Sequence, residues 1–149
     1  MKKTLKKLMT EDVIFLDLVA DSKNGIMAEI VDRLQACGRI EDRQAALTAV
    51  QDRERKMSTG IGHGIAIPHG KTDTVDQLVV AVGRKKGGVD FASLDGKPST
   101  IFIFTLSPLS RSGPHLQFLA EVSKLLKDQK VRDRLLQAQT AEEVIDIFT

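Results

Sequence analysis

The three histidines of this chain, His63, His69 and His115, are its side chains best suited to chemistry near neutral pH. The unperturbed pKa of imidazole lies close to neutrality, so a histidine can act as a nucleophile, transfer a proton or bind a metal. His69 has the most informative surroundings. The apolar run Ile65–Ile67 favours a short strand, and Pro68 removes a backbone donor, which predicts that the strand ends there. We therefore expect His69 to be presented at a rigid strand end.

The residues around His69 favour the binding of an anionic group. Backbone N–H groups of glycines and the hydroxyls of small side chains can surround a phosphate or a carboxylate. The candidate donors are Ser58, Thr59, Gly60, Gly62, Gly64 and Gly70, and Gly70 also allows a backbone or a ligand to approach closely. His115 follows Ser112-Gly113-Pro114, which is typical of the first turn of a helix, where unpaired N–H groups and the positive end of the dipole favour phosphate. The two histidines could thus face one phosphoryl group, with Arg53 neutralising its charge through paired hydrogen bonds.

Two other functions fit the same histidines. A zinc ion held by His63, His69 and His115 could activate a bound water. No carboxylate-rich segment that could support such ligands is apparent, so the phosphoryl site is the preferred interpretation. A non-catalytic scaffold that is recognised by a partner and never phosphorylated would require His69 to be buried.

The elements that must position these residues alternate between strand-like and helical patterns. Strands are predicted at 13–18, 65–67, 77–83 and 100–106, with turns at 87–88 and 95–96. Helices are predicted from a cap at Asp21 or Ser22 to Gly38, at 41–56, 115–128 and 131–138, and after a capping box formed by Thr140 and Glu143. The run 100–106 is apolar enough for a central strand. The pattern predicts one α/β domain over residues 1–149, with a sheet covered by helices on both sides.

Composition excludes several classes of function. The chain has 149 residues, 42% hydrophobic and 28% charged, which is ordinary for a soluble globular domain. A net charge of +2 does not indicate nucleic-acid binding, and no apolar run approaches the ~18 residues of a membrane span. A single cysteine, Cys37, excludes an internal disulfide and fits a reducing cytoplasm.

The stretch Arg53–Gly70, which contains STGIGHGIAIPHG, closely resembles the signature of the fructose/mannitol-type EIIA domains of the bacterial phosphoenolpyruvate:sugar phosphotransferase system. The segment FASLDGKP at 91–98 is similar to the loop before the central strand of that family, and PHLxxLA at 114–120 is similar to its second-histidine helix. Asp21-Ser22-Lys23 stands where the family tends to have a helix-starting lysine. The resemblance extends over nearly the whole chain.

This resemblance implies a mixed β-sheet flanked by helices (the phosphotransferase/anion-transporter-like EIIA fold) and a phosphocarrier function. His69 matches the histidine that is phosphorylated by phospho-HPr or by its nitrogen-branch paralogue. His115 matches the second active-site histidine, and Arg53 matches an arginine near the site. No cofactor and no metal are implied. His63 stands where close relatives commonly carry Asn. It could still donate a hydrogen bond in support of phosphoryl binding, and it would add a second titratable group near the reaction centre.

The family divides into regulatory and transport members. Because the sequence has no transmembrane segment and no second domain with an acceptor cysteine, we expect a nitrogen-regulatory EIIA that acts on a regulatory protein. The alternative is an EIIA that passes phosphate to an EIIB cysteine for the uptake of fructose- or mannitol-type sugars. In both cases a protein donor has to reach His69, so we expect a shallow apolar rim, for which Ile61 and Phe91 are candidates if they are not core residues.

Overall fold

The structure is a computed structural model that describes residues 7–110 and 112–149. The elements follow one another as η1 (Glu11–Val13), β1 (Ile14–Phe15), α2 (Lys23–Ala36), α3 (Arg43–Lys56), β2 (Gly60–Gly62), β3 (Ile65–Ala66), β4 (His69–Lys71), β5 (Val79–Val89), β6 (Ser99–Ser107), α4 (Ser112–Leu126), α5 (Gln129–Gln137) and α6 (Ala141–Phe148). No helix within the described residues is long and apolar enough to cross a membrane.

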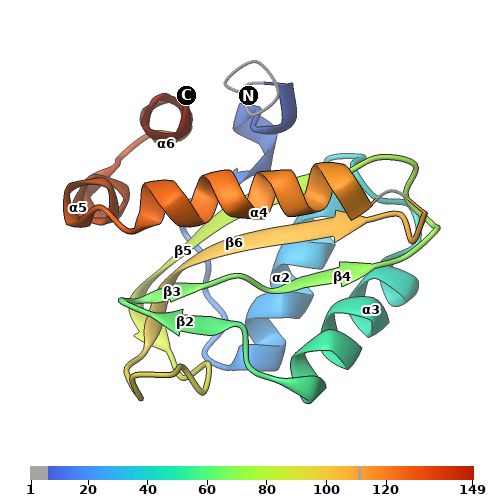
Figure 1. The fold of residues 1–149 in the computed structure, drawn as a ribbon, viewed down its shortest axis with the longest axis horizontal. Helices are drawn as coiled ribbons and strands as arrows, with labels where there is room; N and C mark the ends of the chain where they lie inside the picture. Colours follow the sequence, from blue (N-terminus) through green and yellow to red (C-terminus); the bar gives the residue numbers. More distant parts are fainter. Residues whose placement is uncertain (1–6, 111) are drawn as a thin grey trace.

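One mixed β-sheet organises the fold, as predicted. Its order is β1-β5-β6-β3-β2, and β4 also pairs with β6. The long strands β5 and β6 are antiparallel, whereas β3 and β4 both run parallel to β6. The apolar run predicted as a central strand is β6, whose residues are nearly all buried. Helices α2 and α3 lie on one side of the sheet, and α4 crosses the other side over β6 (Figure 1).

Most helix boundaries are set by the predicted local signals. Ser22 Oγ accepts a hydrogen bond from the N–H of Gly25 (3.0 Å) and caps α2. Gly38 follows that helix with φ of +80°, a conformation that glycine adopts without strain. The predicted N-cap of α6 is confirmed, because Thr140 Oγ1 accepts from the Glu143 N–H (3.2 Å). The Glu143 carboxylate accepts from the N–H of Gln139 (2.9 Å), one residue before the cap, and not from that of Thr140 as in a complete capping box.

Three predictions of local structure were wrong. Gly87 and Gly88 do not form a turn: both have positive φ inside β5, where the register against β6 shifts, so they form a bulge that lengthens the strand to Val89. The strand predicted at 13–18 is limited to Ile14–Phe15. Helix α4 begins at Ser112 and not at His115, because Pro114 is tolerated in a first turn where its missing N–H is not needed. The turn at 95–96 is confirmed by a Gly96 N–H to Ser93 carbonyl bond of 3.0 Å.

Candidate functional site

The break at Pro68 places His69. Strand β3 ends at Ala66, and the Ile67 N–H then donates to the carbonyl of Thr59 (2.9 Å). Pro68 has no N–H, but its carbonyl accepts from Thr105 N–H (3.1 Å), and pairing with β6 resumes at His69 opposite Thr105. The predicted strand end is confirmed. The chain does not leave the sheet, however, and His69 becomes the first residue of a new short strand.

Alternation along β4 sends neighbouring residues to opposite sides of the sheet. Gly70 faces α3: a Cβ built on it would lie 2.7 Å from the carbonyl carbon of Ala49 and 2.8 Å from the nitrogen of Val50. The close approach expected at Gly70 is therefore made by the backbone of α3. His69 consequently faces the opposite side, on which α4 lies.

His115 meets His69 on that side of the sheet. The two ring centroids are 5.4 Å apart and their planes are tilted by 56°. His115 is only 3% exposed, whereas His69 is half-buried. The Nε2 of His115 is 2.9 Å from the hydroxyl of Thr105, the residue that pairs with His69 in the sheet. The structure thus brings together the two histidines that the sequence analysis placed at one phosphoryl group.

The protonation states of the two rings follow from burial and nearby charge. Burial lowers the pKa of His115 to about 4, and the positive charges of His69 and Lys71 act in the same direction. Burial also lowers the pKa of His69; its hydrogen bond to the Ile67 carbonyl and the charge of Glu54 oppose this effect, whereas Arg53 and Lys71 reinforce it. Both rings are therefore neutral near pH 7.

The hydrogen bond of His69 decides which of its nitrogens can react. Nδ1 lies 2.8 Å from the carbonyl oxygen of Ile67. A carbonyl only accepts, so Nδ1 carries the proton and donates it. In a neutral imidazole the other nitrogen, Nε2, then holds the free lone pair. His69 is therefore arranged as a nucleophile at Nε2.

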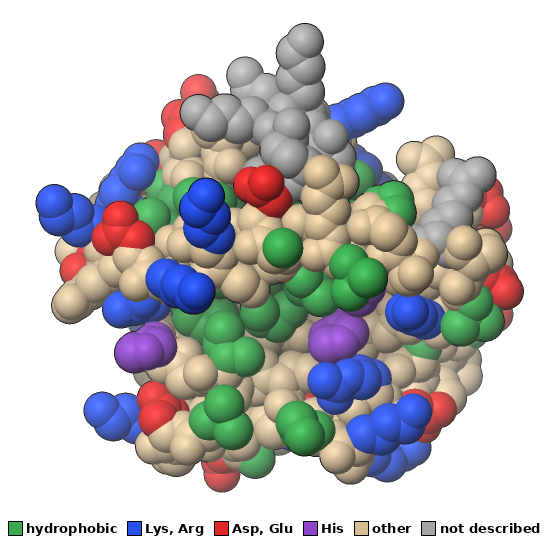
Figure 2. Space-filling view, in the orientation of Figure 1, with side chains coloured by type: hydrophobic (Ala, Val, Ile, Leu, Met, Phe, Trp, Pro, Cys, Tyr) green, Lys and Arg blue, Asp and Glu red, His purple; other side chains and the backbone are tan. Residues whose placement is uncertain are grey.

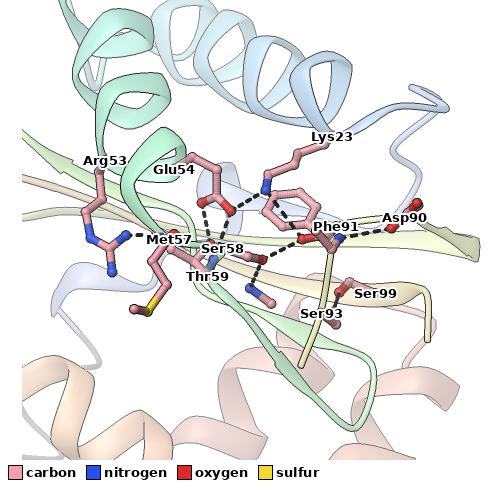
Figure 3. Close-up of polar contacts among 12 residues, drawn as sticks. Lys23, Arg53, Glu54, Met57, Ser58, Thr59, Asp90, Phe91, Ser93 and Ser99 are labelled. Carbon is pink, nitrogen blue, oxygen red and sulfur yellow. Dashed lines mark hydrogen bonds and ion pairs between the residues drawn. The ribbon is translucent and has the colours of Figure 1, made fainter. Parts of the chain in front are cut away.

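Two basic side chains supply positive charge to the site. Arg53, in the last turn of α3, donates from Nη1 to the carbonyl of Met57 (2.8 Å), and its charge is near enough to lower the pKa of His69 (Figure 3). Lys71 lowers the pKa of both histidines and lies on their side of the sheet, two residues after His69 in β4. The sequence analysis did not identify Lys71.

The hydroxyls of Ser58 and Thr59 are used within the protein, contrary to the expected phosphoryl-binding role. Ser58 Oγ donates to the carbonyl of Phe91 (2.6 Å), and Thr59 Oγ1 donates to the carboxylate of Glu54 (2.7 Å) (Figure 3). Each hydroxyl has a single proton to donate, so neither has one left for an anion. Their bonds fix the segment that enters β2.

Glu54 is the centre of this network. It is 6% exposed, and it also accepts from the Thr59 N–H (2.8 Å) and forms an ion pair with Lys23 Nζ (2.7 Å). Lys23 in turn lies over the ring of Phe91, 5.0 Å from its centroid. Because Glu54 follows Arg53 in the sequence, the network anchors the helix end that carries the arginine (Figure 3). In the sequence, Glu54 stands out as an acidic residue among the basic residues Arg53, Arg55 and Lys56, and this pattern could have indicated the network.

Gly60, Gly62 and His63 belong to the β2–β3 hairpin rather than to the histidine pair. Ile65, just after the hairpin turn, pairs with Ile101 of β6, whereas His69 pairs with Thr105 four positions further along, roughly 13 Å at 3.3 Å per residue. His63 is exposed with φ of +56°, and its N–H donates to Asp95 (3.1 Å). Left-handed backbone of this kind is several-fold more common for Asn, Asp and His than for other non-glycine residues.

The proposed three-histidine zinc site is not formed. His63 lies at the hairpin, and the residues that the structure describes hold no cluster of three or more His, Cys, Asp or Glu able to bind a metal. Figure 2 likewise shows histidine side chains at separate places on one face of the molecule. The prediction that His63 adds a second titratable group near the reaction centre is therefore wrong.

The two residues expected at an apolar rim differ in exposure, and other exposed apolar side chains lie near the site residues in the sequence. Phe91 is fully buried in the core, and Ile61 is 43% exposed on the hairpin strand β2. Three exposed apolar side chains flank the site more closely in sequence: Met57 beyond Arg53, Leu116 beside His115, and Leu109 in the loop before α4. Hydrophobic and basic side chains are interspersed on this face (Figure 2).

Comparison with known proteins agrees with this geometry. Residues 7–149 match the family described as phosphoenolpyruvate-dependent sugar phosphotransferase system, EIIA 2. The chain is 38% identical over 144 residues to the fructose-specific EIIABC component of Bacillus subtilis; this match includes 97% of the chain and 23% of that longer protein. It is 38% identical over 137 residues to the fructose-specific EIIA component of Haloferax volcanii, with 92% of this chain and 89% of that protein covered.

A solved structure extends the comparison to the fold. The nitrogen regulatory protein IIA-Ntr from Neisseria meningitidis has a TM-score of 0.87 and 29% sequence identity, over 98% of this chain and 99% of that one. The resemblance indicated by Arg53–Gly70 is thereby confirmed at the level of sequence and of fold. The chain belongs to the EIIA 2 family of the phosphoenolpyruvate-dependent sugar phosphotransferase system.

Proposed function

We propose that this protein is a phosphocarrier that accepts a phosphoryl group on Nε2 of His69 from phospho-HPr or its nitrogen-branch paralogue. The observation that carries the proposal is the hydrogen bond from His69 Nδ1 to the Ile67 carbonyl, which leaves Nε2 with the lone pair at a half-buried site. The lowered pKa of His69 keeps the ring neutral, as a nucleophile requires. Membership of the EIIA 2 family supports the same chemistry.

The transfer is an in-line displacement. The bond from His69 Nε2 to phosphorus forms as the N–P bond of the donor breaks, and the electron pair of that bond returns to the donor's imidazole. The proton on Nδ1 of His69 stays on that nitrogen throughout and keeps its hydrogen bond to the Ile67 carbonyl. The protein's contribution is positioning and charge stabilisation. Arg53 and Lys71 supply the charge, and Arg53 retains N–H groups beyond the one that Met57 accepts.

For the step after phosphorylation, two acceptors are supported by different observations. The close fold similarity to IIA-Ntr supports a nitrogen-regulatory role, in which phosphorylation of His69 controls a regulatory protein. The higher sequence identity to fructose-specific EIIA proteins supports transfer to an EIIB cysteine for sugar uptake. The acceptor assay below separates the two.

The phosphorylation is tested with labelled phosphoenolpyruvate, the first enzyme of the system and HPr or its paralogue. We expect label on the wild-type chain and on His63→Ala, which removes an exposed histidine from the hairpin, and only background label on His69→Ala. Undiminished labelling of His69→Ala would contradict the proposal. Each variant's circular dichroism spectrum controls for folding.

The acceptor is tested by adding an EIIB domain to the phosphorylated chain. Rapid loss of label to the EIIB cysteine would establish the transport role. Retention of label in the presence of EIIB, combined with phosphorylation-dependent capture of a regulatory protein, would establish the regulatory role.

A further inference from the structure

Thr105 is next to both histidines of the site. It is fully buried on β6, it pairs in the sheet with His69, and its hydroxyl is 2.9 Å from Nε2 of His115. Among the described residues His115 is the only hydrogen-bond partner of this hydroxyl. A hydroxyl in the middle of a central apolar strand is costly to bury unless its hydrogen bond is made. The hydroxyl of Thr105 is therefore stabilised in the core by its hydrogen bond with His115.

The direction of this hydrogen bond decides what His115 can do. If the hydroxyl accepted a proton from Nε2, its own proton would be buried without an acceptor, which is unfavourable. If it donates to Nε2, no buried donor is left unpaired. A neutral imidazole has a single N–H, so a donating Thr105 places that proton on Nδ1.

The other nitrogen of His115 is Nδ1. Ser107 Oγ is the sole fully enclosed side-chain polar atom without a partner in the described part of the chain, and His115 Nδ1 makes no hydrogen bond within that part. The ring that carries Nδ1 lies 5.4 Å from the ring of His69, centroid to centroid. An N–H at this position can donate to a phosphoryl oxygen, whereas a lone pair there would repel it.

We propose that Thr105 is a positioning residue that donates its hydroxyl to Nε2 of His115 and thereby holds the ring in the Nδ1–H tautomer, with the N–H available to the phosphoryl group of His69. This inference rests on the proposed function of His69. It adds a requirement for one tautomer of His115. Because the buried ring is neutral, it carries a proton on one nitrogen only, so the position of that proton decides whether Nδ1 can donate.

The tautomer is measured directly by ¹⁵N NMR of the imidazole of His115 in the unphosphorylated wild-type protein. We expect Nδ1 at the chemical shift of a protonated nitrogen and Nε2 at that of an unprotonated one. Thr105→Val keeps the branched shape and removes the hydroxyl, so the two tautomers should then be mixed. Thr105→Ser keeps the hydroxyl and should restore the wild-type spectrum. A wild-type spectrum with the proton on Nε2 would overturn the proposal.

The kinetic consequence is measured as the rate of phosphorylation of His69. Losing a single hydrogen bond to the transferred group predicts a roughly tenfold lower rate for Thr105→Val and recovery to within about twofold for Thr105→Ser. In a His115→Ala background, Thr105→Val should cause no further loss, because it acts through that ring. An equal loss in both backgrounds would show a merely structural role and overturn the proposal. A wild-type chain that takes no label would overturn the function proposed for His69, while the NMR spectra would still decide the role of Thr105.

Discussion

Gly70 lies against the backbone of Ala49, so that a Cβ added to the glycine would be 2.7 Å from the Ala49 carbonyl carbon and 2.9 Å from its oxygen. This contact joins β4 to α3 at the residue next to His69. It therefore sets the separation between His69 and the helix end that carries Arg53. Because the neighbouring atoms are backbone, they cannot rotate away as a flexible side chain would.

Gly70→Ala is expected to destabilise the protein by about 1–3 kcal/mol, the usual cost of overpacking, and to reduce phosphorylation of His69 by separating α3 from β4. Chemical denaturation and labelling measure the two effects. The matched control is Gly113→Ala, at the start of α4, where an added Cβ meets no described atom within 4 Å apart from its two chain neighbours and the backbone of its own helix. A Gly70→Ala protein as stable and active as the control would refute this role of the contact.

Glu54→Ala is expected to cost about 3–5 kcal/mol of unfolding free energy, because it leaves Lys23 without its partner and the buried Thr59 N–H and hydroxyl without an acceptor. Asp52→Ala is the control on the same helix: Asp52 forms an exposed pair with Arg55, and its loss should change stability by less than about 1 kcal/mol. Since the chain has no Trp or Tyr, unfolding is followed by circular dichroism. Equal effects of the two substitutions would contradict the importance of the Glu54 network.

Stability should fall in acid partly because of His115. Its pKa is lowered to about 4 in the folded protein from 6.5 when unperturbed. Between these two pH values His115 binds a proton in the unfolded chain but not in the folded one. The contribution of neutral His115 to the free energy of unfolding is therefore complete above pH 6.5 and is lost as the pH falls toward 4. The shift corresponds to a contribution on the order of 3 kcal/mol.

The contribution of His115 is isolated by denaturing the wild type and His115→Gln at pH 7.5 and pH 4.5. The wild type should lose about 2–3 kcal/mol more than the variant between the two pH values. Parallel losses would mean that His115 is not buried as a neutral ring. The comparison with a variant is needed because His69 also has a lowered pKa and adds to the total.

Phosphorylated protein should carry its phosphoryl group on Nε2 of His69 and not on Nδ1, because Nδ1 donates to the Ile67 carbonyl. Correlation of ³¹P with the ring ¹⁵N nuclei distinguishes the two isomers. The same spectra should show Nδ1 still protonated after transfer. Phosphate found on Nδ1 would require the Ile67 hydrogen bond to break and would contradict the mechanism.

Local sequence signals predicted the parts of the fold that depend on neighbouring residues. The caps at Ser22 and Thr140 formed because a hydroxyl reaches a backbone N–H three residues away in the same chain segment. The break at Pro68 followed from a missing N–H, and the apolar run of β6 predicted its central place. The pairing of His69 with His115 was also predicted, from a strand end and a helix start that both favour an anion.

The use of each polar group was decided by the tertiary structure. Ser58 and Thr59 were expected to bind phosphate, but Phe91 and Glu54 lie within reach of their hydroxyls and accept the protons instead. A hydrogen bond between distant residues depends on sheet register and helix placement, which no short sequence pattern contains.

Sheet register and helix placement also decided which of the three histidines lie together. By itself the sequence determined most of the elements, the family and the candidate nucleophile His69, although it did not predict β2 or β4. The parallel register of β3 and β4 against β6 then put Ile65, just after the hairpin turn that carries His63, four ladder positions from His69. The packing of α4 on β6 put His115 beside His69, where its ring contacts Thr105. Distance along the chain gives no measure of distance in space once strands pair and helices pack, so only the folded structure could decide which histidines act together.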